Sequence, residues 1–149
     1  MNDSLQRIRR TAMEMGACRL AGQMDSPRDA VRLLFTAQGR EFCMKHQWPS
    51  RAEFASMARE LENEPGIFIE SGRAMTGTID VLASGASDVT VLASGADRLR
   101  HVVACNGARV RLDVRNHAVV TACAFSGAHI DITNDGTGSV TLEMSDRNG

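Results

Sequence analysis

The sequence predicts an α+β protein: an N-terminal helical cap followed by a short β-solenoid (parallel β-helix) of strand-and-turn units, each about ten residues long. Three observations support this prediction. Apolar residues recur at a nearly constant interval, at Ile79, Val89, Leu99, Val110, Val120, Ile130 and Val140. Small turn-forming residues recur between them, and the first part of the chain has the periodicity of helices instead.

Residues 1–65 carry the spacing and the start signals of helices. Cap residues or apolar stripes predict four helices, which begin near Leu5, at Ser26-Pro27, at Thr36 and at Ser50. Ser50 and Glu53 have the spacing of a capping box, in which each residue bonds the backbone amide of the other. Pro65-Gly66 ends the last of these helices.

From Ile67 onward the apolar period changes to two, as in strands. The residues two positions after the recurring apolar residues are Val81, Val91, His101, Leu112, Ala122, Ile132 and Leu142. The residues four positions after them are Ala83, Ala93, Val103, Val114, Ala124, Asn134 and Met144. We expect all three positions to face the interior, with His101 and Asn134 as polar exceptions. Ile67 and Ile69 predict one further strand.

Two folds agree with short strands joined by short turns. In a solenoid each strand stacks on its equivalent one coil away, so the turns must be alike, and small residues such as Ser126-Gly127-Ala128 recur at these positions. Two strands for each coil give a repeat of about twenty residues and three to four coils. The alternative is an antiparallel β-meander or sandwich, which Asn106-Gly107 favours because this dipeptide is typical of hairpins.

The predicted organisation is a helical cap region at 1–65, a β-solenoid at 66–144 and a polar tail at 145–149. We expect the helices to cover the first coil. A solenoid leaves its terminal strands unpaired, so we expect the last coil to be guarded by the polar tail or to dock on a second copy. One interval, from Leu99 to Val110, is a residue longer than the others and predicts a bulged corner beside Cys105-Asn106-Gly107.

Charge and cysteine content limit the functions to consider. The chain has 17 basic and 18 acidic residues, so it lacks the strong basicity of most nucleic-acid binders. Four cysteines (Cys18, Cys43, Cys105 and Cys123) are scattered, which predicts free thiols in a reducing compartment. With neither a secretion signal nor a membrane-spanning stretch evident, we expect a cytoplasmic protein without a membrane partner.

Residues of catalytic or metal-binding type do not form a recognisable motif. Cys43 and His46 have the spacing of two zinc ligands, but no second pair stands at a matching interval. The outward carboxylates of the predicted strands are Asp80, Asp113, Asp131 and Glu143. They lack the aromatic platforms of carbohydrate-cleaving solenoids, so the sequence predicts neither an enzyme nor a cofactor.

Five arginines form the candidate partner-binding group: Arg98, Arg100, Arg109, Arg111 and Arg115. They could bind an acidic protein, and the favoured prediction is a non-catalytic interaction module that binds protein, including a second copy of itself. In a two-strand coil Arg111 would stack near Thr90 and Asp131 and form ordinary surface ion pairs. The alternative is a nucleic-acid-associated regulator that adds Arg7, Arg9 and Arg10 to this group.

The repeat pattern also resembles a group of uncharacterised β-solenoid repeat proteins from gut bacteria and their mobile elements. The resemblance rests on Leu99 to Leu142, above all on Val102-Val103-Ala104-Cys105-Asn106-Gly107-Ala108 and Asn116-His117-Ala118-Val119-Val120. It covers about half of the chain and implies a solenoid, without implying an activity.

Overall fold

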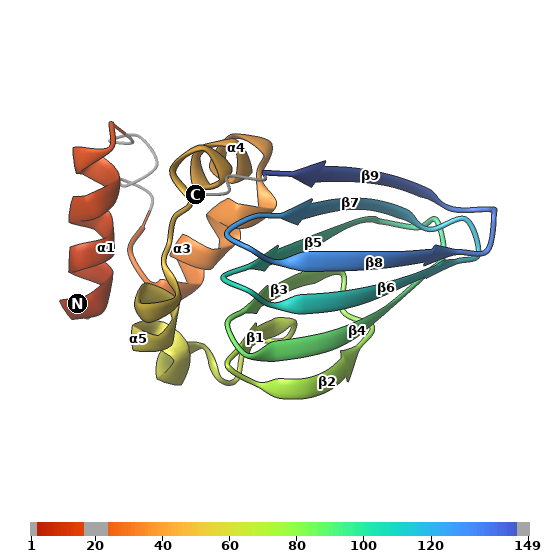
Figure 1. The fold of residues 1–149 in the computed structure, drawn as a ribbon, viewed down its shortest axis with the longest axis horizontal. Coiled ribbons are helices and arrows are strands. Elements are labelled where there is room, and N and C mark those ends of the chain that lie inside the picture. Colours follow the sequence, from red (N-terminus) through yellow and green to blue (C-terminus); the bar gives the residue numbers. More distant parts are fainter. Residues whose placement is uncertain (1–2, 17–23, 146–149) are drawn as a thin grey trace. The chain divides into compact units, whose positions relative to one another are not determined.

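The computed structural model describes residues 3–16 and 24–145 of the chain. The chain divides between Glu64 and Pro65 into two compact units, a helical unit and a solenoid unit, which are described separately (Figure 1). Cys18 and residues 146–149 of the predicted polar tail lie outside the described residues.

The helical unit contains the predicted helices. They are α1 (Asp3–Glu14), α3 (Pro27–Arg32), the 3₁₀ turn η1 (Leu33–Phe35), α4 (Ala37–His46) and α5 (Arg51–Leu61). The Ser26 hydroxyl accepts a hydrogen bond from the Asp29 amide at the start of α3. At α5 the predicted capping box is present, because Ser50 and Glu53 each accept a hydrogen bond from the backbone amide of the other.

The solenoid unit consists of short strands with tight corners (Figure 1). The strands are β1 (Ile67–Ile69), β2 (Gly72–Thr76), β3 (Asp80–Ser84), β4 (Ser87–Ser94), β5 (Leu99–Cys105), β6 (Arg109–Arg115), β7 (Val119–Ala124), β8 (His129–Asn134) and β9 (Ser139–Met144). The odd-numbered strands form one sheet in the order β1-β3-β5-β7-β9, here called the odd sheet. The even-numbered strands form the even sheet, in the order β2-β4-β6-β8.

Every pair of neighbouring strands is parallel, so the solenoid prediction is confirmed and the antiparallel meander is wrong. The corners explain why Asn106-Gly107 favoured the wrong fold. Asn106 and Gly107 both have positive φ, at 57° and 82°, which is also the geometry of a hairpin turn. Here the turn leads from β5 in the odd sheet to β6 in the even sheet, and the later corners at Asn116-His117 and Ser126-Gly127 repeat it.

The coils differ in length, and this corrects the predicted register of β5. Val81 lies beside Val102, which lies beside Ala122, and all three belong to the core. Val102 and Ala104 therefore face inward, whereas the prediction that Leu99, His101 and Val103 do so is wrong. The additional residue is in the turn between β4 and β5, because β4 pairs with β6 at an offset of 21 residues and β5 with β7 at 20. The bulge predicted beside Cys105 is therefore misplaced.

The core of the solenoid lies between the two sheets. Val110, Leu112 and Val114 of β6 point into it, and they alternate with charged residues on the outer face of the even sheet. The odd sheet does not alternate: Leu82, Val103 and Cys123, on its outer side, are as fully buried as the core residues.

Candidate interaction surfaces

The two sheets end on neighbouring strands of the last coil. β8 is the final strand of the even sheet and β9 the final strand of the odd sheet (Figure 1). Among the described residues each of them pairs with one neighbour only, β8 with β6 and β9 with β7. The backbone on the other side of both strands is therefore available for pairing, as at any sheet edge.

Three inward apolar side chains of this last coil are exposed, whereas Ile130 at the start of β8 remains in the core. Ile132, Leu142 and Met144 are 37%, 39% and 54% exposed, whereas their register partners one coil earlier, Leu112, Ala122 and Ala124, are at most 1% exposed. These three apolar side chains and the two unpaired strand edges define what we call the open end. The repeat pattern predicts an interior position for all three, because the pattern is the same in a covered coil and in an uncovered one.

Asn134, the polar residue in the same inward series, closes the last turn. Its side-chain nitrogen donates to the Gly138 carbonyl at 3.0 Å, and its side-chain oxygen accepts from the amides of Gly136 and Gly138 at 3.0 and 3.2 Å. The side chain therefore satisfies backbone groups of a turn on which no other strand in the described part of the chain stacks. Its polarity in the sequence was a sign that this coil is not buried.

An aspartate also holds this turn, which spans residues 135–138. The Asp135 carboxylate accepts hydrogen bonds from the Thr137 hydroxyl at 2.6 Å and amide at 2.9 Å, and from the Asn116 amide of the preceding coil at 3.1 Å. Hydrogen bonds to the charged form, those from Thr137 first, lower the pKa of Asp135 from its usual 3.8. This carboxylate therefore joins the last two coils.

The five predicted partner-binding arginines occupy three different environments. Arg109, Arg111 and Arg115 share the outer face of β6, here called the arginine face, and all three are exposed. Arg98 is exposed in the turn between β4 and β5. The structure therefore brings only part of the predicted group together.

Arg100 takes part in the structure of the solenoid. It stands at the inward register position beside Val120, and its guanidinium donates to the carbonyls of Gly77 at 3.2 Å and Ser94 at 2.9 Å. These bonds join the turn after β2 to the end of β4. We therefore remove Arg100 from the candidate partner-binding residues, since its guanidinium is engaged with the chain itself.

Acidic residues interleave with the arginine face. Arg111 lies 3.6 Å from Asp88, and Arg115 binds Asp113 with two nitrogens, at 3.0 and 3.1 Å. Arg111 is also the register partner of Thr90 on one side and Asp131 on the other, as predicted for a two-strand coil. Exposed ion pairs of this kind contribute about 0–1 kcal/mol each, and they reduce the net positive charge of the face.

The predicted outward carboxylates do not converge. Asp113 and Asp131 lie on the even sheet, whereas Asp80 and Glu143 lie on the odd sheet. Asp80 contacts His101, with 2.9 Å between the carboxylate and Nδ1. His101 therefore faces outward beside an acidic partner and does not break the apolar core.

The Cys43–His46 pair lies on α4, where the two side chains have different surroundings. Cys43 is buried, and the His46 ring packs on Phe42 with 4.4 Å between ring centroids. Within the described residues, no group of three or more histidine, cysteine or acidic side chains is placed to hold a metal ion.

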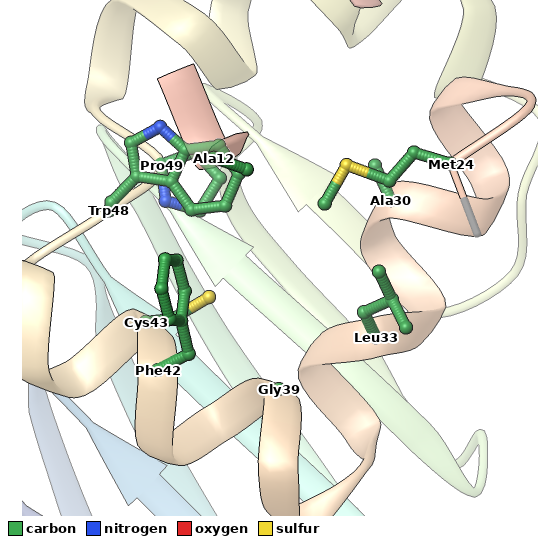
Figure 2. A pocket seen from close by; sticks show the side chains of 9 residues that line it. All are labelled: Ala12, Met24, Ala30, Leu33, Gly39, Phe42, Cys43, Trp48 and Pro49. Atoms are coloured by element: carbon green, nitrogen blue, oxygen red, sulfur yellow. The ribbon is translucent and has the colours of Figure 1, made fainter. Parts of the chain in front are cut away.

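A small apolar pocket lies in the helical unit. Figure 2 shows Phe42 and Trp48 on one side of it and Met24 and Leu33 on the other. Its volume is about 10 Å³, which is about the space of one water molecule. We interpret this pocket as a packing gap, because a small-molecule site needs a far larger volume of about 300–1,000 Å³.

The described cysteines, Cys43, Cys105 and Cys123, form no disulfide, and all three are buried. Burial raises the pKa of the Cys105 thiol to about 12, so this thiol stays protonated at neutral pH. The prediction of free thiols is confirmed for these three residues.

Comparison with protein-family models, curated proteins and solved structures finds no match to this chain. The described helices include none with the length and apolar character needed to cross a bilayer.

Proposed function

We propose that this protein is a non-catalytic interaction module that binds another protein chain through the open end of its solenoid. The observation that carries the proposal is the contrast between the last two coils. Leu112, Ala122 and Ala124 are buried in one coil, whereas their register partners in the next coil, Ile132, Leu142 and Met144, are exposed. Exposed apolar side chains beside unpaired strand edges are typical of surfaces that another chain covers.

The open end offers two kinds of contact. The free backbone groups of β8 and β9 can hydrogen-bond an added strand, and such pairing provides affinity without specific side chains. Ile132, Leu142 and Met144 would be removed from water by the same strand, which adds hydrophobic stabilisation.

A protein partner agrees better with the charges than a nucleic acid does. Asp88 is paired with Arg111, and Asp113 is paired with Arg115. These carboxylates would repel a phosphate backbone, which would have to displace them in order to reach the arginines. We further infer a cytoplasmic location, which is supported by cysteines that form no disulfide, Cys43, Cys105 and Cys123.

Site-specific photo-crosslinking tests the proposal. A photoreactive residue is placed at Leu142 on the open end, or at Leu92 as a control, in cells that contain the full chain. Leu92 is 42% exposed on the outer face of β4, so its exposure matches that of Leu142. We expect a defined protein adduct from position 142 and not from position 92. Equal labelling from both positions, or no adduct from either, would contradict the proposal.

A further inference from the structure

We propose that the chain covering the open end is a second copy of this protein, docked end to end about a two-fold axis. Each of the strands β8 and β9 then pairs antiparallel with the same strand of the other copy. This inference rests on the proposed function, because it names the occupant of the same surface.

Strand length favours this arrangement over head-to-tail stacking. β8 and β9 are six residues long, whereas β1 and β2 at the other end of the solenoid have three and five residues. The first coil is also short, since β1 pairs with β3 at an offset of 15 residues and β7 pairs with β9 at an offset of 20. The last coil therefore matches an identical coil along its whole length, and only part of the first coil. A two-fold contact between identical ends also closes, so it stops at a dimer.

The charges on β8 select a register. Residues directly opposite in an antiparallel pair place their side chains on the same face. Pairing centred on Asp131 would set this carboxylate against its own copy, which is unfavourable. Pairing centred on Ile132 instead sets Asp131 opposite Thr133 of the second copy, where the hydroxyl can donate to the carboxylate.

The same register suits β9. The turn at 135–138 places Asn134 and Ser139 at the same end of the coil, so Thr141 lies across the core from Ile132. Pairing centred on Thr141 sets Glu143 opposite Ser139 of the second copy, again a carboxylate opposite a hydroxyl. No two like charges are then directly opposite on either strand.

The size of the open end sets the expected affinity. A strand of six residues is about 20 Å long and the two sheets lie about 10 Å apart, so the end covers only about 200 Å² in cross-section. Standard interfaces bury about 800 Å² on each partner. We therefore expect a weak, reversible dimer.

Sedimentation velocity of the full chain from about 1 μM to about 500 μM tests the proposal. The wild type should pass from monomer to dimer and form no larger species. Leu142→Glu should raise the dissociation constant at least about tenfold, because it places a charge in the apolar centre of the contact. The matched control Leu92→Glu adds the same charge at a comparably exposed leucine on β4 and should leave the dissociation constant unchanged.

A second pair of variants tests the register and keeps the inference testable if Leu142→Glu disturbs folding. Thr133 is exposed, so substitution there should not affect the core. Thr133→Lys places an amine opposite Asp131 of the second copy and should tighten the dimer. Thr133→Asp places two carboxylates opposite each other and should weaken it.

The outcomes separate this inference from the proposed function. A chain that stays monomeric at all concentrations, or a dimer that neither Leu142→Glu nor the Thr133 variants alter, overturns the two-fold contact. A monomeric chain that still gives an adduct with a different protein at position 142 overturns this inference alone. A dimer that responds to these variants, with an adduct of twice the chain mass at position 142, supports both.

Discussion

Leu112 on β6 and Ile132 on β8 are register partners in adjacent coils, yet Leu112 is 1% exposed and Ile132 is 37% exposed. Both residues point to the same side of the same sheet. The difference arises because β8 pairs with β6 on the side of Leu112, whereas among the described strands none pairs with the outer edge of β8. Position in the stack, more than residue type, therefore decides how much each inward side chain contributes to stability.

This relationship predicts unequal costs for similar substitutions. Leu112→Ala should lower the free energy of unfolding by about 2–5 kcal/mol, because it leaves a cavity in a closed coil. Ile132→Ala should cost about 1 kcal/mol or less, because solvent already reaches the side chain. Urea unfolding followed by far-UV circular dichroism, at a protein concentration too low for dimers, measures both values. Equal losses would show that the last coil is covered in solution.

Arg100 is expected to stabilise the solenoid without binding a partner. Arg100→Met removes the hydrogen bonds to Gly77 and Ser94 and should lower the free energy of unfolding by about 1–3 kcal/mol. Arg98→Met, in the neighbouring exposed turn, is the control and should have little effect. A comparison of the two unfolding curves decides this, and a stable Arg100→Met variant would return Arg100 to the candidate binding group.

Asp135 predicts a dependence of stability on acid pH. Its pKa is lower in the folded chain than in the unfolded chain, where it is near 3.8, so folding favours the ionised form. The stabilisation is complete above the unfolded-state pKa and is lost as pH falls through the folded-state pKa. We expect Asp135→Asn to be less stable than wild type at pH 7 and to lose less stability on acidification. Thr137→Val should reproduce part of this change in thermal melts between pH 7 and pH 2, and parallel curves for all three proteins would contradict the assignment.

Cys105 should resist alkylation while the protein is folded. Burial holds the pKa of its thiol at about 12, so little thiolate forms even at pH 8.5. Iodoacetamide followed by peptide mass spectrometry should modify Cys105 only after denaturant is added. Rapid modification of Cys105 in the native protein would show that the solenoid opens at this position.

The capping box of α5 should contribute measurably to the helical unit. Ser50→Ala removes the acceptor for the Glu53 amide and should cost about 1 kcal/mol. Ser56→Ala is the control, because the Ser56 hydroxyl is exposed and only bonds back to the Glu53 carbonyl within the helix. Fluorescence of Trp48, the single tryptophan of the chain, follows the unfolding of this unit.

Most of the fold was predictable because the helix start signals and the recurring strand-and-turn pattern each specify one structure in their part of the chain. Ser26 and Ser50 marked helix starts by their chemistry, and the similar corners required a stack of similar coils. The register of β5 was not predictable. Leu99 is apolar and lies ten residues after Val89, so it fits the repeat better than Arg100, which occupies the inward position. Both faces of the strand also carry apolar residues. The sequence does not predict β2, because the first coil is shorter than the later ones and breaks the ten-residue interval.

The candidate surfaces were less predictable than the fold. The sequence places Arg109 and Arg111 on one outer face by alternation alone, and the structure agrees. It cannot show that Arg100 turns toward backbone carbonyls, because this depends on where the ends of two other strands come together. Nor does it distinguish Leu142 from its buried equivalents, since exposure depends on the neighbouring coil.

The offset of 20 residues, shared by the last coils, makes the solenoid modular. Duplication of one whole coil would insert an equivalent layer, move the terminal strands outward by about 4.8 Å, and leave their sequence and chemistry intact. Evolution or design can therefore change the length of the solenoid in fixed increments without altering the open end. An insertion of an odd number of residues within a strand would turn inward residues outward, whereas the additional residue in the turn between β4 and β5 leaves the pairing of the later strands intact.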